Sequence, residues 1–200
     1  MDWVMTVTQD RKRPPRKAGA ETRAGRPDWI MAALTLLGRS GIDAVRVEPL
    51  ADKLGVTKGS FYWHFKDRDA LHMAMLEAWR ADTTHNVIAR VEAESARKGE
   101  RLTLLIGLAT RNTALPRLEI AIRAWAKTDE RVAGAVGEID RQRTDYVASL
   151  LRDLGIEPRT ARLRAKILYL ALIGGLFSEG GGPPDGALWA EAERLIARNT

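Results

Sequence analysis

The sequence of 200 residues contains no cysteine, which excludes disulfide bonds and thiolate-ligated metal sites. No apolar run approaches the roughly 18 residues that a transmembrane helix needs. The first ten residues, MDWVMTVTQD, lack both the basic start and the long apolar stretch of a signal peptide. The three histidines, at positions 64, 72 and 85, do not have the spacing of metal ligands. We therefore expect a cytoplasmic protein that has no membrane partner and no bound metal.

Motifs for catalysis or nucleotide binding are also missing. Tyr62 and Lys66 have the YxxxK spacing of some dehydrogenases, but no glycine-rich strand-turn-helix precedes them to hold a dinucleotide. Ser60 and His64 lie one helical turn apart, yet the chain has no GxSxG elbow. The sequence therefore predicts a protein that is not an enzyme and needs no cofactor.

The periodicity of the apolar residues is helical throughout, and no segment is typical of a strand. Hydrophobic residues make up 45% and charged residues 29% of the chain, as in an ordinary globular protein. We predict an all-α fold with a disordered N-terminal arm (1–26), a three-helix head (27–73) and a larger helical domain (74–200). The expected helices cover about 28–39 (N-capped by Asp28), two short segments within 47–66, 67–92, 101–114, 116–127, 130–154, 159–178 and 186–198.

Positive charge is concentrated at the N-terminal end. Residues 1–80 hold 14 Lys and Arg against 10 Asp and Glu, whereas the rest of the chain holds 18 against 16. The segment RKRPPRKAGAETRAGR, which ends at residue 26, has seven basic residues and almost nothing to bury, so we expect it to be disordered. Two hypotheses stay open for it: a solvated tail, or an arm that follows the DNA backbone or enters the minor groove.

Residues 47–66, VEPLADKLGVTKGSFYWHFK, read as two short helices joined by a tight turn. Val47, Leu50, Ala51 and Leu54 form one apolar stripe, in which the small Ala51 lets a second helix cross closely. Gly55 supplies the left-handed turn that ends the first helix, because glycine adopts positive φ at no steric cost. Thr57 is then expected as the N-cap of the second helix.

The second helix is expected to expose residues that gain little from contact with water. Phe61 and Phe65 share one face and can pack on the first helix, which turns Lys58, Tyr62 and Trp63 outward. Lysine reaches phosphates and guanine edges, hydroxyl and imidazole groups bond phosphate oxygens, and aromatic rings touch thymine methyl groups. The predicted DNA contacts are Arg46, Thr57, Lys58, Gly59, Ser60, Tyr62, Trp63, His64, Lys66 and Arg68.

The segment LADKLGV followed by TKGSFYWHFKDRDAL closely resembles the DNA-binding motif of the TetR family of bacterial transcriptional regulators. The resemblance covers roughly residues 27 to 80, and Trp63 stands where the family more often has a tyrosine. It implies a homodimer with one helix-turn-helix on each subunit, a helical C-terminal domain that binds a small molecule, and release of a DNA operator when that molecule binds.

The C-terminal half offers candidates for an effector site and for an interface. Candidate ligand contacts combine aliphatic and aromatic side chains: Leu105, Leu118, Ile122, Trp125, Tyr146, Leu150 and Tyr169. A packed core has the same composition, so both interpretations stay open for each of them. Arg123, Asp140, Thr110 and Asn112 are polar groups that could orient a ligand. The stripe of Leu163, Ile167, Leu170, Gly174 and Phe177 is the expected dimer interface, together with the last helix.

These observations favour a ligand-responsive transcriptional regulator, most simply a repressor that binds a palindromic operator as a dimer. Two other hypotheses remain: an architectural DNA-binding protein without an effector, and a helical carrier of a small molecule that no longer binds DNA. A single palindromic high-affinity site would exclude the architectural protein. Absence of DNA binding at low salt would leave the carrier.

Overall fold

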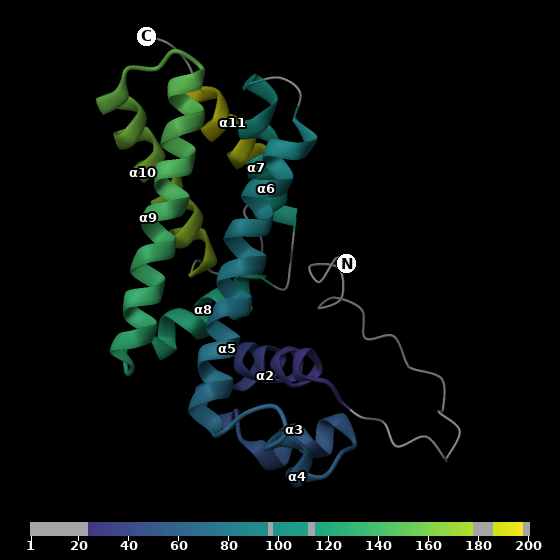
Figure 1. The fold of residues 1–200 in the computed structure, drawn as a ribbon. Coiled ribbons are helices and arrows are strands. Elements are labelled where there is room, and N and C mark those ends of the chain that lie inside the picture. The colour runs from purple at the N-terminus through teal and green to yellow at the C-terminus, as the bar shows by residue number, and fades with distance from the viewer. Residues whose placement is uncertain (1–23, 96–97, 112–114, 178–185, 198–200) are drawn as a thin grey trace.

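The chain folds into helices stacked in two parts, a small head and a taller body (Figure 1). This computed structural model describes residues 24–95, 98–111, 115–177 and 186–197, so most of the predicted N-terminal arm, residues 1–23, lies outside it. Within these ranges every regular element is a helix, which confirms the all-α fold class. No helix among them is long and apolar enough to cross a membrane.

The head begins with α2 (Arg26–Ser40), which starts two residues earlier than predicted. Asp28 is not its N-cap. Gly25 holds that position instead, and Asp28, inside the first turn, accepts a hydrogen bond of 2.8 Å from the Gly25 amide. The Pro that follows Arg26 suits the first turn of a helix, where an amide hydrogen is not needed, and this explains the earlier start. The short 3₁₀ helix η1 (Ile42–Ala44) connects α2 to the next helix.

The two short helices of the motif are α3 (Val47–Leu54) and α4 (Lys58–Phe61). Gly55 has φ of 68° and ψ of 36°, the left-handed conformation predicted for the turn between them. Thr57 occupies the N-cap position of α4, but its side chain makes no capping bond. After one turn of α4 the chain continues through hydrogen-bonded turns, with the Phe65 amide donating to the Phe61 carbonyl at 3.0 Å.

The core of the head is built around aromatic rings from α2 and α4. Phe61 is fully buried; its ring meets that of Trp29 edge-on at 5.3 Å and stacks on that of Phe65 at 5.3 Å. Leu50 and Ala51 of α3 are buried in the same cluster. The prediction that Phe61 and Phe65 face inward is therefore confirmed.

One long helical segment connects the head to the body. It consists of α5 (Arg68–Arg80), a π-helical turn η2 (Ala81–His85) and α6 (Asn86–Glu94), close to the single helix expected over 67–92. Asp67 caps it as predicted, accepting a bond of 2.8 Å from the Ala70 amide. The π turn was not predicted; within it, the Thr83 hydroxyl donates to the Trp79 carbonyl at 2.6 Å.

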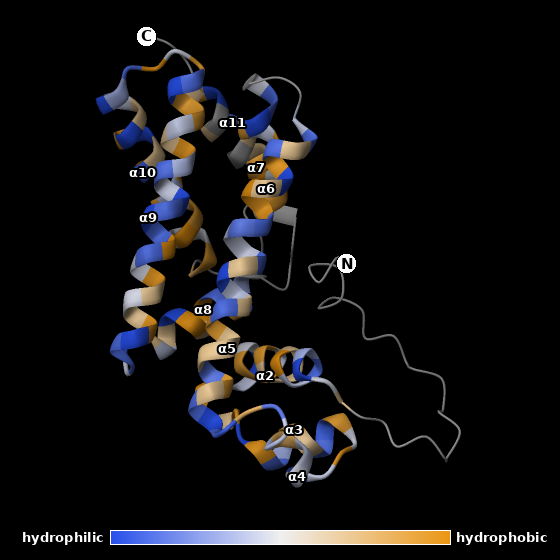
Figure 2. Cartoon of the chain, in the orientation of Figure 1, coloured by the Kyte–Doolittle hydropathy of each residue, from blue (hydrophilic) through white to orange (hydrophobic). Residues whose placement is uncertain are grey.

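The body contains the remaining helices, whose bounds agree with the predicted ranges to within a few residues. They are α7 (Lys98–Arg111), α8 (Leu115–Trp125), α9 (Glu130–Asp153), α10 (Pro158–Leu176) and α11 (Gly186–Ala197). Helices α9 and α10 run side by side, and α8 lies across the lower end of the body next to α2 (Figure 1). Both α2 and α8 carry several apolar residues (Figure 2).

Two apolar clusters hold these parts together. The first fills the head and continues into the body through residues of α8 and α9: Leu118, Ile122, Trp125, Val132, Val136 and Ile139. The second lies higher in the body, between α7, α9, α10 and α11. The proposed domain boundary at residues 73 and 74 falls inside α5, and the first cluster passes across it. The head thus shares its core with the base of the body.

Replacing Phe61 by alanine should destabilise the head strongly. Removing a fully buried ring leaves a cavity beside Trp29 and Phe65, and such losses cost about 3 to 5 kcal/mol. Denaturant unfolding followed by circular dichroism measures this difference. The matched variant Trp63→Ala removes a ring that is 87% exposed and should change the free energy of unfolding by less than about 0.5 kcal/mol. Equal losses in the two variants would contradict the assignment of faces.

Candidate nucleic-acid interface and internal cavity

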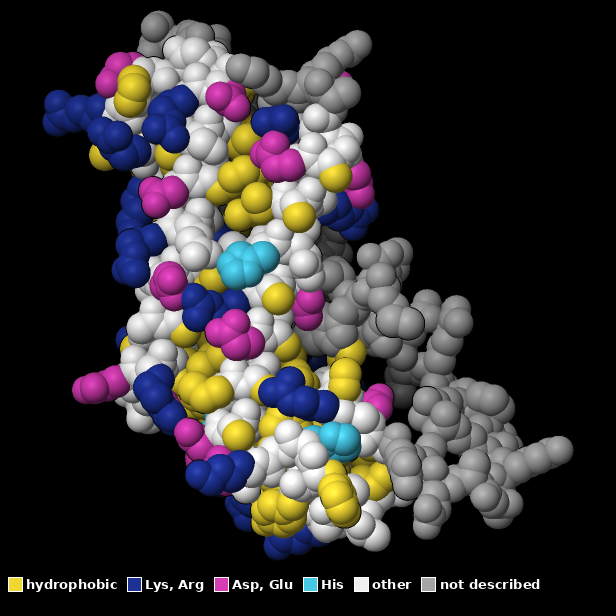
Figure 3. All heavy atoms as spheres, viewed as in Figure 1, with side chains coloured by type: hydrophobic (Ala, Val, Ile, Leu, Met, Phe, Trp, Pro, Cys, Tyr) yellow, Lys and Arg dark blue, Asp and Glu magenta, His cyan; other side chains and the backbone are white. Residues whose placement is uncertain are grey.

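The outer end of the head presents large aromatic side chains to solvent. Tyr62 is 57% exposed and Trp63 is 87% exposed, although both lie between the buried Phe61 and Phe65. Because Phe61 and Phe65 are fixed in the core, the turn between them has to project the residues in between. In Figure 3, apolar and basic side chains gather at this end of the molecule. Exposed apolar side chains that adjoin one another are typical of surfaces that bind another molecule.

Lys58 and Gly59 lie at the start of α4 on the same exposed end. The ammonium group of Lys58 forms an ion pair with the carboxylate of Glu48, in the first turn of α3. A Cβ atom built at Gly59 would meet only the Thr57 hydroxyl, at 3.8 Å. The described part of the chain therefore gives no steric reason for a glycine here. A glycine at an exposed position lets another molecule approach the backbone closely.

Other predicted contacts are partly engaged within the head itself. The hydroxyl of Ser60 donates to the Thr57 carbonyl at 2.8 Å, and Arg46 Nε donates to the Asp43 carbonyl at 3.0 Å. His64 is only half-exposed, because its Nε2 lies 2.9 Å from the Ala24 carbonyl oxygen. Its ring therefore fixes the start of the head, a role that the sequence did not indicate.

Two of the predicted cations flank this surface, together with a third that the sequence analysis did not include. Lys66 and Arg68 are exposed as expected, just before α5 and at its first residue. Arg26, which was not among the predicted contacts, places its guanidinium 5.0 Å from the centre of the Phe65 ring. The ion pair of Glu48 with Lys58 was not predicted either. Sequence periodicity relates residues within one helix and does not reveal a pair formed across a turn.

The body contains a partly open cavity of about 140 Å³ between α6, α7, α9 and α10, with η2 and α8 at its lower end. Of the predicted ligand contacts, Leu105, Tyr146 and Tyr169 line it. The other four, Leu118, Ile122, Trp125 and Leu150, are instead packed in the two apolar clusters. The structure therefore does not support these four as ligand contacts. The sequence could not separate the two roles, because core residues and cavity residues have the same composition and periodicity. The side chains of Thr110 and Asn112 lie outside the described structure.

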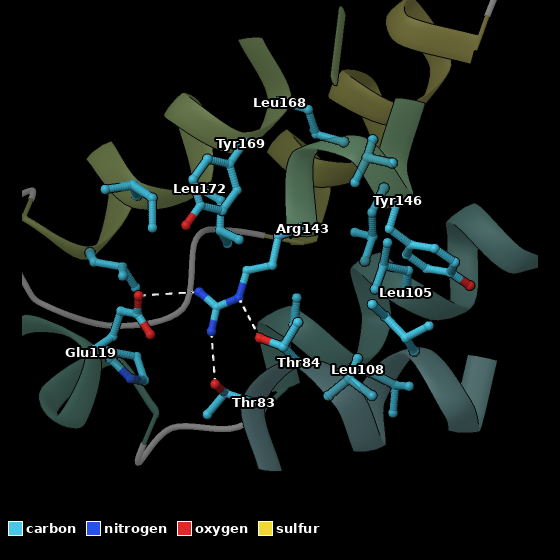
Figure 4. A pocket seen from close by; sticks show the side chains of 18 residues that line it. Thr83, Thr84, Leu105, Leu108, Glu119, Arg143, Tyr146, Leu168, Tyr169 and Leu172 are labelled. Carbon is cyan, nitrogen blue, oxygen red and sulfur yellow. Dashed lines mark hydrogen bonds and ion pairs between the residues drawn. The ribbon is translucent and has the colours of Figure 1, made fainter. Parts of the chain in front are cut away.

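Most of the cavity wall is aliphatic, and the polar groups gather around Arg143 of α9 (Figure 4). Its guanidinium donates to the hydroxyls of Thr83 and Thr84 at 2.8 and 2.9 Å and to the Glu119 carboxylate at 3.2 Å. It also lies 5.6 Å from the centre of the Trp79 ring. The π turn therefore has a structural role, since it places both threonines toward Arg143.

A second arginine closes the polar cluster. Arg123 of α8 donates to Glu119 at 2.9 Å and to Asp140 at 2.6 Å, and the Tyr169 hydroxyl donates to Asp140 at 2.5 Å. Burial by itself would raise the pKa of Asp140, but the hydrogen bonds from Arg123 and Tyr169 outweigh it and lower that pKa. Burial raises the pKa of Tyr169 to about 12. Two guanidiniums and two carboxylates thus neutralise one another at the polar end of the cavity.

His72 marks the junction between head and body. It is buried on α5, with its ring edge-on to Trp125 of α8 at 5.1 Å. Burial, aided by the nearby charge of Arg68, lowers its pKa and favours the neutral ring. In the described residues no group of three or more His, Asp and Glu side chains is arranged to hold a metal ion.

Known proteins resemble the chain in sequence mainly over the head. The family model "Bacterial regulatory proteins, tetR family" matches residues 30–75. The class A tetracycline repressor from transposon 1721 of Escherichia coli is 44% identical over 59 residues, which is 29% of this chain and 27% of that protein. The regulator AcrR of Shigella flexneri is 29% identical over 90 residues, or 45% of this chain and 40% of AcrR. These alignments span less than half the length of either relative.

Longer matches extend over the body. The repressor Rv1474c of Mycobacterium tuberculosis is 29% identical over 156 residues, covering 70% of this chain and 75% of the repressor. A TetR-family regulator from Agrobacterium tumefaciens has the same fold, with a TM-score of 0.67, 20% identity and coverage of 86% of this chain and 95% of the other. A transcriptional regulator from Rhodococcus matches with a TM-score of 0.65 at 19% identity, over 87% and 92% of the two chains. The family model and the curated relatives thus place the head in the TetR family of bacterial regulatory proteins, and the chain as a whole shares the fold of the TetR-family regulator from Agrobacterium tumefaciens.

Proposed function

We propose that the chain is a transcriptional regulator that binds a palindromic DNA operator as a homodimer and releases it when a small molecule fills the cavity. The observation that carries the DNA-binding part is the exposure of Tyr62 and Trp63 beside Lys58, on a turn whose neighbouring phenylalanines are fixed in the core. A DNA groove offers phosphates, guanine edges and thymine methyl groups to this set of side chains. Relatives with the same motif are named as repressors, which favours repression.

An apolar stripe on α10 supports the homodimer. Leu163, Ile167, Leu170 and Phe177 are each between 55% and 62% exposed and recur along one side of the helix. Gly174 lies between them, and a Cβ built there would meet no other atom within 4 Å, so a second helix can come close. A self-complementary interface of this kind gives two heads related by twofold symmetry, which suits a palindrome.

The cavity supports an uncharged and mainly apolar effector. At its polar end the wall contains Arg143 and Glu119, which are already paired with each other, and Glu119 is also paired with Arg123 behind the wall, so an ionised ligand would have to break a buried pair. An apolar cavity of about 150 Å³ accommodates a molecule the size of benzene. We therefore infer that the effector is about the size of one ring, with its polar group, if it has one, near Arg143.

The long segment from α5 to α6 gives the cavity a route to the head. Leu71 and Met75 of α5 are buried in the core of the head, whereas Thr84 and Val87 further along the same segment line the cavity. An effector that binds one arrangement of this segment more tightly shifts the population of heads toward that arrangement. The effector then changes operator affinity by the same factor as the operator changes effector affinity, and this factor cannot exceed the ratio of the effector affinities of the two arrangements.

Selection of bound duplexes from random DNA tests DNA binding. The chain should enrich one palindromic sequence, and Lys58→Ala and Tyr62→Ala should each weaken binding to it by about 1 to 3 kcal/mol while leaving the unfolding transition unchanged. Lys127→Ala, which removes an exposed lysine from the body, is the control and should bind as the wild type does. Wild-type affinity in both head variants would contradict the proposed interface. Uniform binding to all duplexes would favour the architectural protein.

Ile167→Glu tests the dimer. A carboxylate at the centre of the stripe should be desolvated in the interface, so the variant should sediment as a monomer and lose at least about a hundredfold in operator affinity. Arg152→Glu, a charge change at an exposed position of α9, should remain dimeric. If Ile167→Glu sediments as a dimer, the α10 stripe is not the interface.

Ala109→Phe tests the effector site. Neutral one-ring compounds are screened for those that raise the melting temperature of the wild-type protein and release its selected duplex. The new ring should fill part of the cavity, so the same compounds should neither stabilise nor release Ala109→Phe, which should still bind DNA. Ala89→Phe, at an exposed position of α6, should respond as the wild type does. Release of DNA from Ala109→Phe at wild-type compound concentrations would place the effector elsewhere.

A further inference from the structure

Glu48 is an exposed acidic residue that lies beside the basic and aromatic residues of α4. It lies in the first turn of α3, and its carboxylate pairs with the Lys58 ammonium at the start of α4. The two side chains are 59% and 54% exposed, respectively, so solvent reaches both groups. The phenol of Tyr62 is also close enough to add to the raised pKa of Lys58, for which the Glu48 bond is the main cause. Glu48, Lys58 and Tyr62 therefore occupy one continuous patch.

A carboxylate in this patch is unfavourable for contact with the DNA backbone. Phosphates repel it, and it neutralises the lysine that would otherwise attract them. Base edges in the major groove offer it a favourable partner, because the amino group of cytosine donates to a carboxylate. Lysine, in turn, donates to O6 and N7 of guanine. These groups lie next to one another on the edge of a single C·G base pair, as the carboxylate and the ammonium do here.

We propose that Glu48 and Lys58 together read one C·G base pair in each half of the operator, with Glu48 accepting from cytosine and Lys58 donating to guanine. Glu48 is then a specificity-determining residue: it lowers the affinity for unrelated DNA sequences and favours cytosine at one position. The inference rests on the proposed DNA-binding function. Removing the carboxylate should broaden the choice of base at that position and strengthen binding to unrelated duplexes.

The test compares the sequences selected from random DNA by the full-length wild type and by Glu48→Ala. The wild type should require a C·G pair at one symmetric position, where any other pair weakens its binding about tenfold or more. Glu48→Ala should accept all four bases there within about threefold, and keep the preferences of the wild type elsewhere. Its affinity for an unrelated duplex should rise, with about one more counterion released in the salt dependence.

Two further variants separate specific recognition from general charge effects. Glu94→Ala removes an exposed carboxylate that is paired with Arg90 on α6, and it should change neither the selected sequence nor the salt dependence. Glu48→Gln keeps the size of the side chain, and it should relax the cytosine preference while melting at the wild-type temperature. If the wild type selects a palindrome and Glu48→Ala selects the same one with the same base dependence, the pair does not read DNA. If the wild type selects no sequence, the DNA-binding proposal itself fails.

Discussion

The packing of Phe61 and Phe65 against Trp29 is the constraint on which the rest of the head depends. Phe61 and Phe65 are four residues apart and both buried, so their packing fixes the orientation of the short turn that connects them. That setting leaves Tyr62 and Trp63 exposed at the outer end of the molecule, whatever their affinity for water. Burial of Phe61 and Phe65 thus sets the orientation of Tyr62 and Trp63, and in the proposed function a DNA groove covers these two exposed rings.

The same core links this surface to the body. Helix α5 leaves the head through the first apolar cluster, and the base of α8 and α9 belongs to that cluster as well. Above it, the π turn brings Thr83 and Thr84 to Arg143, while the Trp79 indole donates to Glu119 at 3.2 Å. The cavity wall and the support of the head are thus parts of one helical segment. A small structural change at the cavity therefore acts on the segment from α5 to α6, which supports the head.

Much of the fold was predictable from the sequence, because helix periods, glycines and caps are local signals. The bounds of α3, the left-handed Gly55, the Asp67 cap and the helices of the body follow the predictions. The N-cap of α2 was predicted at Asp28 but is Gly25, one turn earlier, because the proline just before Asp28 permits an earlier helix start. The residues that line the cavity were harder to predict, because periodicity identifies the apolar face of each helix but not the helices that it contacts. Leu105 and Tyr169 line it, but Ile122 and Trp125 belong to the core, and Arg143 was not foreseen. Contact of the predicted head residues with DNA stays a prediction.

The most direct measurement of the central claim is ¹⁹F NMR of protein labelled with 5-fluorotryptophan, with the Trp63 resonance identified by its loss in Trp63→Phe. In the free protein this resonance should show a large solvent isotope shift between H₂O and D₂O, because the side chain is 87% exposed. Adding the selected duplex should abolish most of that shift, whereas the resonance of the fully buried Trp29 should be unaffected. An unchanged isotope shift at Trp63 in the saturated complex would contradict the claim that DNA completes this surface.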